Sequence, residues 1–323
     1  MRKALATALT LAALATLPLW VGNTFYVNIA SQILIYAIFA LGLNVLVGYA
    51  GLVSLGHAGL FGVAAYSVAW LAASGASDFA AAVGAIAATL AISAVFAMLA
   101  LRATGIGFLM ITLALGQIVW GIAYRWISLT NGDNGINLAG RPSLLGFSLE
   151  GASAFYLFVL AAFLLAVASM AIFVRSPLGA SLRGTRDQPR RMNALGYNVW
   201  LVRFLAFLFS GFWTCAAGLL YCYYHKFVSP QLLQLNASAE VLLMVISGGS
   251  GTLLGPIFGA TLVTAMKTVA SAYIERWNLV LGAIFVAIIV FMPEGLVPGS
   301  VRLWRWARRS LGAPTARAAG GNP

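Results

Sequence analysis

A few polar side chains interrupt the long apolar stretches of this chain, and they are the residues whose chemistry could carry a function. Ser54, His57, Thr112, Gln117 and Glu240 fall in or near segments made almost wholly of apolar residues. Polar groups are costly to place in hydrocarbon, so each of them is a candidate for lining a path through a membrane. A histidine and a carboxylate could also relay protons, but His57 and Glu240 lie near the ends of their segments.

Each of these residues also has a structural explanation. Ser54 and Thr112 can bond back to the carbonyl groups of their own helix, and Gln117 can hold two helices together. His57 can be a satisfied histidine at a helix end. Glu240 can sit at the membrane interface, where a helix N-terminus favours a carboxylate, or it can sense a solute or a delivering protein.

The sequence lacks the residue combinations of the common enzyme sites. Cys215, Cys222, His57 and His225 do not form a metal-ligand cluster. Seven residues separate the cysteines, which places them two helical turns apart and too far apart for a disulfide. The Gly-x-x-x-x-Gly-Lys-Ser/Thr phosphate loop is absent from the sequence, so the chain is not expected to bind ATP in that way. We therefore expect no catalytic site and no bound cofactor.

The composition is that of a membrane protein built of helices. The chain has 323 residues, of which 62% are hydrophobic and 8% charged, and its mean hydropathy is +0.94. A soluble domain carries roughly 25% charged residues. The apolar runs suit helices that cross about 30 Å of hydrocarbon, and they lack the alternation of a membrane β-barrel. We therefore expect an all-α, polytopic membrane protein.

We predict about ten transmembrane helices in a domain formed by residues 1–300. Their ranges are 5–21, 29–47, 55–73, 80–101, 105–125, 155–174, 203–222, 237–249, 254–273 and 279–292. The eighth is too short to cross as a straight helix, so we expect it to be broken, tilted or merged with the glycine-rich segment that follows. Arg2 and Lys3 before the first apolar run also fit a secretory signal, but the number of spans favours a retained helix.

The basic residues orient the chain. With the N-terminus inside, 14 of the 19 Lys and Arg residues fall on the inner side, and both termini lie in the cytoplasm. Most of these 14 occupy the loop 175–202 and the basic tail 301–323, whose end has a disorder-like composition. The other five are Arg125, Arg141, Lys226, Lys267 and Arg276. The net charge of +12 is thus an orientation signal and does not indicate nucleic-acid binding.

The inner loop is predicted to form two short helices. Ser176 can cap the first, with a proline at its first position, and Leu178 and Leu182 lie four apart on one face. Asp187 can cap the second, and Gly196 fits the position that ends it. The pair could lie on lipid headgroups, which would attract its arginines, or it could dock a cytoplasmic partner.

Glycines and turn residues mark two further segments. Gly248, Gly249 and Gly251 could break a helix so that backbone lines a path, or they could allow close helix packing. A similar series lies about 200 residues earlier, which fits a transporter of two related halves and equally fits small-residue packing. In the outer loop, Asp133 and Asn134 fit turn chemistry or a contact with a protein that delivers the solute. The earlier series is Gly51, Gly56, Gly59 and Gly62.

Four ordered motifs resemble the permease subunits of branched-chain amino acid ABC importers, the LivH/LivM family, and its LivM-like members in particular. The motifs are Gly51-Leu-Val-Ser54-Leu-Gly56-His57-Ala-Gly59, Thr130-Asn-Gly-Asp133-Asn134-Gly135, the loop from Ser176 to Gly196, and Gly248-Gly249-Ser-Gly251-Thr252-Leu-Leu-Gly255-Pro256-Ile-Phe-Gly259-Ala260. The resemblance covers about residues 27–300. The chain departs from the family where Asn131 replaces the usual glycine, and where Gln188 to Arg191 replace acidic residues in the loop.

The resemblance implies a transport machine. In that family a second, LivH-like permease completes the pore, two cytoplasmic ATPases use ATP to drive it, and a periplasmic binding protein delivers the solute at the bacterial inner membrane. Leucine, isoleucine and valine are the implied solutes, while related permeases carry urea, amides or aromatic acids. The competing class is an ion-coupled secondary transporter, which would need a relay of acids or histidines across the spans.

Three sets of candidate site residues follow. The ATPase-coupling loop, whose helices 177–186 and 188–195 would transmit ATPase closure, comprises Pro177, Leu178, Gly179, Leu182, Arg183, Arg186, Asp187, Ala194, Leu195 and Gly196. The translocation path comprises Ser54, Gly56, His57, Thr112, Gln117, Glu240, Gly248, Gly249, Gly251 and Thr252. The expected contacts with the binding protein are Asp133 and Asn134.

Overall fold

The computed structural model describes a bundle of helices with a few very short strands at one end. The described residues are 23–138, 140–144, 147–273, 277–292 and 295–300, together with Thr16 and Pro18. The helices are α2 (Thr24–Asn44), the π-helix η1 (Val45–Ala50), α3 (His57–Ala73), α4 (Asp78–Ala100), α5 (Ile106–Arg125), α6 (Ile127–Thr130), the 3-10 helix η2 (Gly132–Asn134), α7 (Ala152–Arg175), α8 (Pro177–Asp187), α9 (Pro189–Ala194), α10 (Val199–His225), the 3-10 helix η3 (Pro230–Leu233), α11 (Leu235–Gly248), α12 (Gly255–Tyr273) and α13 (Trp277–Phe291).

The polytopic helical fold is confirmed. Each predicted span from 29–47 onward coincides with a helix to within a few residues, whereas the tail 301–323 and all of the predicted span 5–21 except Thr16 and Pro18 lie outside the described residues. In the described part, α2 with η1, α4, α5, α7 and α10 are long and apolar enough to cross a membrane, and α3 and α11 are shorter apolar helices. With 14 residues, α11 is only about 21 Å long, so it does not reach across the bilayer by itself.

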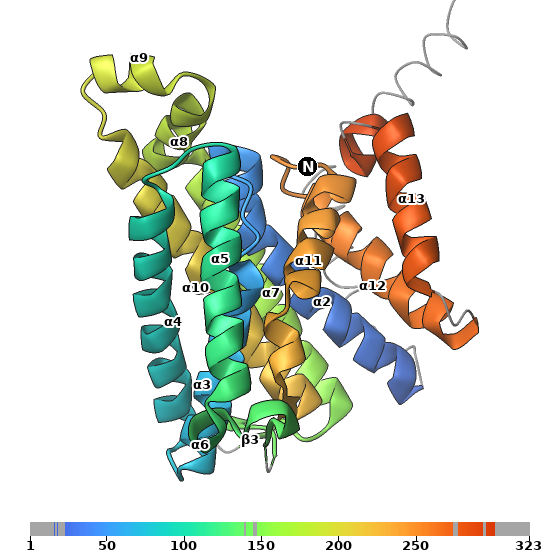
Figure 1. The fold of residues 1–323 in the computed structure, drawn as a ribbon. Helices are drawn as coiled ribbons and strands as arrows, with labels where there is room; N and C mark the ends of the chain where they lie inside the picture. Colours follow the sequence, from blue (N-terminus) through green and yellow to red (C-terminus); the bar gives the residue numbers. More distant parts are fainter. Residues whose placement is uncertain are drawn as a thin grey trace, which may run out of the picture.

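The helix α2 lies at the centre of the bundle and runs obliquely through it (Figure 1). It packs against α7, α10, α11 and α12, and α3 packs against α4 and α10. Small residues permit this close packing. A Cβ added to Gly218 of α10 would lie 2.4 Å from the carbonyl oxygen of Phe61, and one added to Gly56 would lie 2.4 Å from that of Thr112.

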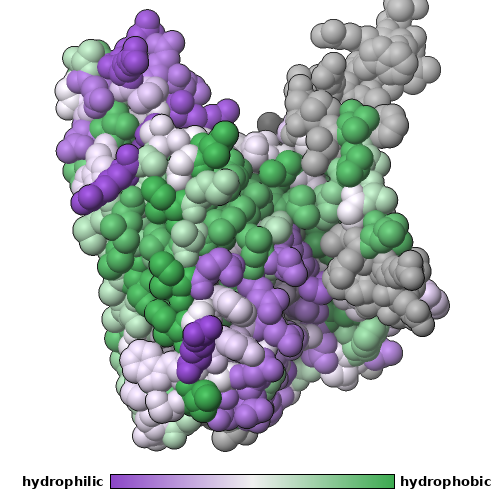
Figure 2. Space-filling view, viewed as in Figure 1, coloured by the Kyte–Doolittle hydropathy of each residue, from purple (hydrophilic) through white to green (hydrophobic). Residues whose placement is uncertain are grey.

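The bundle presents an apolar belt between two polar ends. Figure 2 shows this belt on the side formed by α4 and α5, with hydrophilic residues gathered over α8 and α9 at one end and at the opposite end of the molecule. Exposed apolar side chains on these outer helices include Phe79, Met110 and Ile118. Such a belt fits contact with lipid tails.

One polar end, called the α8–α9 face, carries α8 and α9. The opposite end, called the strand face, carries four two-residue strands. On the strand face β1 (Ile136–Asn137) pairs antiparallel with β4 (Phe227–Val228), and β2 (Ser143–Leu144) pairs antiparallel with β3 (Phe147–Ser148). The pairing of β1 with β4 ties the outer loop to the segment that follows α10.

Candidate functional site

His57 lies in a closed and buried hydrogen-bond cluster. Its Nδ1 lies 2.8 Å from Oγ of Ser54 and its Nε2 lies 2.9 Å from Oγ of Ser210, which itself donates to the carbonyl oxygen of Gly42. Because the single hydroxyl hydrogen of Ser210 goes to Gly42, Nε2 must donate to Ser210, and Nδ1 then accepts from Ser54. The neutral ring is fully satisfied, which supports the structural explanation over a proton relay.

The two other hydroxyl candidates behave differently from each other. Thr112 does bond back, through Oγ1, to the carbonyl oxygen of Leu109 at 2.9 Å, and it also accepts from the N–H of Leu55. For Ser54 the expected bond to its own helix is wrong. It lies before the first residue of α3, and its hydroxyl instead meets His57 and the N–H of Gly56. Gln117 is half-buried on α5.

The two glycine-rich segments are helix breaks that meet inside the fold. The first follows η1, where Gly51 has a φ of +68°, and the second follows α11, where Gly249 and Gly251 have φ values of +115° and +78°. Side chains other than glycine rarely adopt such angles. Asn44 joins the two breaks, because its Nδ2 donates to the carbonyl oxygen of Thr252 and its Oδ1 accepts from the N–H of Gly251, both at 2.9 Å.

Close packing and helix breaking therefore occur together at this junction. A Cβ on Gly48 would overlap the backbone of Gly251, and one on Gly248 would overlap the carbonyl group of Gly255. Thr252 caps the next helix, since its Oγ1 accepts from the N–H of Gly255 at 3.0 Å. The predicted path residues Gly248, Gly249, Gly251 and Thr252 thus lie together, while Ser54, Gly56, His57 and Thr112 form a separate cluster between α3, α5 and α10.

The loop predicted to contact an ATPase folds as the two expected helices. Ser176 caps α8 by accepting from the N–H of Gly179 at 3.2 Å, with Pro177 as its first residue, and Gly196 follows α9 with a φ of +87°. The predicted capping of α9 by Asp187 is wrong. Asp187 is the last residue of α8, and the residue that precedes α9 is Gln188, whose side chain makes no capping bond.

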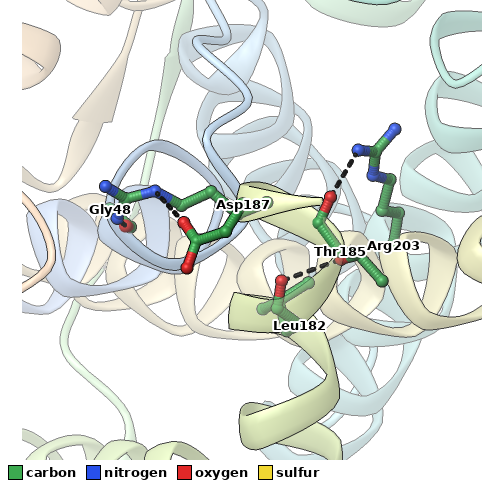
Figure 3. A network of polar contacts seen from close by, with 6 residues as sticks. Gly48, Leu182, Thr185, Asp187 and Arg203 are labelled. Carbon is green, nitrogen blue, oxygen red and sulfur yellow. Dashed lines mark hydrogen bonds and ion pairs between the residues drawn. The ribbon is translucent and has the colours of Figure 1, made fainter. Parts of the chain in front are cut away.

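One side of α8 is anchored to the bundle. Leu182 is fully buried, and Nη1 of Arg186 donates to the carbonyl oxygen of Gly48 at 2.5 Å. Nε of Arg186 also lies 3.7 Å from Oδ1 of Asp187. Figure 3 shows Arg203 of α10 donating to the carbonyl oxygen of Thr185. The anchor thus joins α8 both to the first helix break and to α10.

The other side of the loop is exposed. Leu195 is 67% exposed although it is a large apolar residue, and its neighbours Ala194 and Gly196 are exposed as well. Arg183 is exposed as well, and its Nη1 donates to the carbonyl oxygen of Val174. On the anchored side, Gly179 is buried and Leu178 is half-buried. The loop therefore combines a buried anchor with an exposed tip that carries apolar and basic side chains.

The strand face carries the residues predicted to contact a delivering protein. Asp133 and Asn134 are exposed in η2, and Asn131 before them takes a φ of +61°, a conformation that glycine adopts most easily. No local sequence pattern indicated the neighbouring ion pair, in which Nζ of Lys226 lies 2.7 Å from Oε2 of Glu150. This hydrogen bond, with one from the N–H of Arg141, lowers the pKa of the Glu150 carboxyl.

Glu240 forms an ion pair in the wall of a cavity of about 850 Å³. Both of its carboxylate oxygens accept from Nζ of Lys267, each at 3.1 Å. The Glu240 side chain is 18% exposed and that of Lys267 is 35% exposed. The cavity lies between α2, the end of α10, η3, α11 and α12. Lys267 was predicted only as an orientation signal, because its partner lies on another helix.

Across the residues that the structure describes, no group of His, Cys, Asp and Glu could hold a metal ion. Cys215 and Cys222 are buried free thiols, as their spacing predicted. The polar features of this part of the chain are therefore a buried cluster, a junction of helix breaks, an anchored loop and a charged cavity. None of them assembles the nucleophile, base and oxyanion donors of an enzyme site.

Comparison with known proteins identifies the family. The family described as the permease component of the branched-chain amino acid transport system matches residues 25–289. The high-affinity branched-chain amino acid permease LivM of Escherichia coli K12 is 31% identical over 84% of this chain and 70% of its own length. LivH of the same organism is 24% identical over 81% of this chain and 91% of its own length.

A more distant similarity reaches the autoinducer 2 import permease LsrC of Salmonella paratyphi B, which is 29% identical over 49% of this chain and 45% of its own length. No solved structure matches the chain. The family match covers the described spans from α2 to α13, including both helix breaks and the coupling loop. This chain is a multi-pass membrane protein that belongs to the family of branched-chain amino acid transport permeases.

Proposed function

We propose that this chain is the LivM-like permease subunit of an ABC importer that carries branched-chain amino acids into the cell. A LivH-like permease would form the other half of the pore, two ATPases would dock on the α8–α9 face, and a periplasmic binding protein would dock on the strand face. The α8–α9 face and both termini would then be cytoplasmic in a bacterial inner membrane. The basic residues of the loop support this orientation.

The observation that carries the proposal is the double character of α8 and α9. Leu182 and Arg186 hold α8 against the bundle, and Leu195 extends an exposed apolar side chain away from it. A surface helix that only rested on lipid would turn its apolar residues toward the bilayer. An anchored helix with an exposed apolar tip instead fits an element that a partner binds and whose movement the anchor transmits to the bundle. The charge pattern of the tip, with Arg190 and Arg191, calls for a partner surface of complementary acidic character.

The proposed path runs beside the junction of the two helix breaks. The backbone at Gly249 and Gly251 is irregular, and irregular backbone at membrane depth needs protein or a water-lined path around it. The anchored arginine of α8 contacts this junction through Gly48. Motion of α8 driven by ATPase closure would therefore reach the junction directly. The two breaks have a similar glycine content, and this similarity is what supports an origin of the chain in two related halves.

The test is purification of the chain from native membranes followed by mass spectrometry of its partners and by uptake assays. We expect an ATPase, a second permease and a binding protein to co-purify, and leucine uptake to require ATP. Recovery of the chain alone, with uptake abolished by collapse of an ion gradient, would support the secondary-transporter class. A binding protein that prefers urea, an amide or an aromatic acid would keep the machinery and change the solute.

A further inference from the structure

We infer that the cavity beside Glu240 and Lys267 is a solute site for a zwitterionic amino acid, where Lys267 receives the carboxylate and Glu240 receives the ammonium group. The inference rests on the function proposed above and places a binding site within this chain. It concerns neither the His57 cluster nor the coupling loop. The volume of the cavity, about 850 Å³, falls in the range of small-molecule sites.

The positive charge of Lys267 and the negative charge of Glu240 make the cavity complementary to a molecule that carries one negative and one positive group. Glu240 and Lys267 pair with each other, with both carboxylate oxygens 3.1 Å from Nζ. An amino acid can exchange this one pair for two, because its carboxylate replaces Glu240 at Lys267 and its ammonium group replaces Lys267 at Glu240. A solute with only one charge would leave one protein charge without a partner, and that costs free energy in a partly buried site.

One part of the remaining wall suits an aliphatic side chain. Tyr36 and Tyr221 meet edge to face with their ring centroids 6.3 Å apart, and Tyr221 also packs against Phe61 at 5.3 Å. Leu232, Leu243 and Phe227 extend this apolar part of the lining. The rest of the wall is polar and carries His225, Ser229, Gln231, Gln234 and Asn236. Small-molecule sites combine apolar walls with polar groups that fix the orientation of the ligand.

The position of the pair also offers a route for release. Glu240 lies on α11 and Lys267 on α12, and these two helices pack against each other on either side of the glycine break. Arg186 lies close to that break, since a Cβ on Gly251 would be 3.7 Å from its Nη1. A shift of α8 would therefore change how α11 and α12 meet. The separation of the two charges, and with it the affinity for a zwitterion, would follow the state of the coupling loop.

The test compares leucine uptake by cells that express the complete transporter with wild-type chain or with variants of it. The informative variant is the double change Glu240→Gln with Lys267→Met, because it removes both charges and leaves neither one unpaired. Neutral replacement of an ion pair often has little effect on stability. The control is Thr261→Val on α12, whose hydroxyl bonds only to the carbonyl oxygen of Ile257 in its own helix.

We expect the double variant to lower leucine uptake at least about tenfold, as the loss of two charged hydrogen bonds to the solute implies, with normal amounts of co-purified ATPase. The control should transport like wild type. In the purified complex without binding protein, leucine should raise the melting temperature more than leucinamide or 4-methylpentanoate does, and the double variant should lose this difference.

The outcomes separate this inference from the proposed function. If wild-type cells import leucine and the double variant imports it equally well, the pair is only structural and the solute site is refuted, while the function stands. If wild-type cells import no amino acid but do import an uncharged solute, the proposed substrate fails and the zwitterion site fails with it. If the double variant loses both uptake and ATPase co-purification, it has a folding defect, and the melting temperatures of the wild-type complex decide: equal effects of leucine, leucinamide and 4-methylpentanoate would refute the site.

Discussion

The guanidinium of Arg186 donates a hydrogen bond to the carbonyl oxygen of Gly48, which lies 138 residues earlier in the chain. The same side chain lies against Gly51, where an added Cβ would be 3.0 Å from its Cγ, and close to Gly251. One arginine of α8 therefore contacts the first helix break and lies near the second. Because broken helices lack part of their own hydrogen bonding, an external donor at such a carbonyl fixes the local backbone.

We predict that Arg186→Gln uncouples transport from ATP hydrolysis. The variant loses the donor to Gly48 and the positive charge, so uptake should fall about tenfold or more, as expected for a lost charged hydrogen bond of about 1.5–3 kcal/mol. ATPase co-purification should stay normal, because the exposed tip of the loop is unchanged. Uptake and ATP hydrolysis are measured together in reconstituted vesicles.

The matched control is Arg102→Gln. Arg102 is an exposed arginine in the turn between α4 and α5, so this change removes the same charge without touching a helix break. Uptake by the control should equal that of wild type. Equal uptake by the Arg186→Gln variant would show that the bond to Gly48 takes no part in coupling.

A second prediction separates the anchor of the coupling loop from its tip. Leu182 is fully buried, whereas Leu195 is 67% exposed. Leu182→Ala should lower the free energy of unfolding by about 2–5 kcal/mol, as for other buried leucines, and should lower the melting temperature of the purified chain. Leu195→Ala should leave the melting temperature unchanged and reduce ATPase co-purification, because the variant has less apolar surface to bury against the partner.

The contrary result for this pair is equally clear. If Leu195→Ala retains the ATPase in full and Leu182→Ala loses it without any change in melting temperature, the two residues have the opposite roles. The partner would then bind the side of α8 that the structure places against the bundle.

A third prediction concerns the second helix break. Gly251 and Gly75 both have positive φ values, of +78° and +83°, so changing either one to alanine should cost about 1–2 kcal/mol in backbone strain. Gly75 has open space around it, whereas a Cβ on Gly251 would lie 3.2 Å from the carbonyl oxygen of Gly48. Gly251→Ala should therefore impair uptake beyond its effect on stability, and Gly75→Ala should not. Equal uptake by the two variants at matched expression would exclude a role for this contact.

The helical framework was predictable because each span is a continuous apolar run. The runs from 29–47 onward fall within a few residues of the described helices, since the thickness of the bilayer sets the length of a helix almost independently of its neighbours. Local capping was predictable where one residue decides it, as at Ser176. It failed at Asp187, where the side chain lies beside Arg186 within the same helix and so does not reach the start of α9.

The long-range contacts of the candidate site residues were not predictable from local patterns. Glu240 was a candidate, but its partner Lys267 lies 27 residues away on another helix. His57 was a candidate too, and the sequence could not show that Ser210 would satisfy its ring from 153 residues away. The π-helix η1 was not predicted either, and its Gly48 packs against Gly251, which lies about 200 residues later. Such pairings follow from how the helices cross.

The last prediction concerns pH and the ion pair of the strand face. The Nζ of Lys226, and after it the backbone N–H of Arg141, hold the pKa of the Glu150 carboxyl below its usual range. A folded-state pKa below the unfolded value of about 4.3 means that the pair stabilises the fold above that pH. This stabilisation is lost as the pH falls through the lower folded-state pKa. The pair is half-exposed, so its effect should be small and sensitive to salt.

We therefore predict that Glu150→Gln lowers the melting temperature slightly at pH 7, and that the difference from wild type shrinks below about pH 4.3 and disappears as the pH falls through the folded-state pKa of Glu150. The variant keeps the size and hydrogen-bonding capacity of the side chain but removes the charge that Lys226 meets. Thermal melts of both proteins at low salt over this pH range provide the measurement. A difference that stays constant down to pH 3 would show that the carboxylate charge contributes nothing to the stability of the strand face.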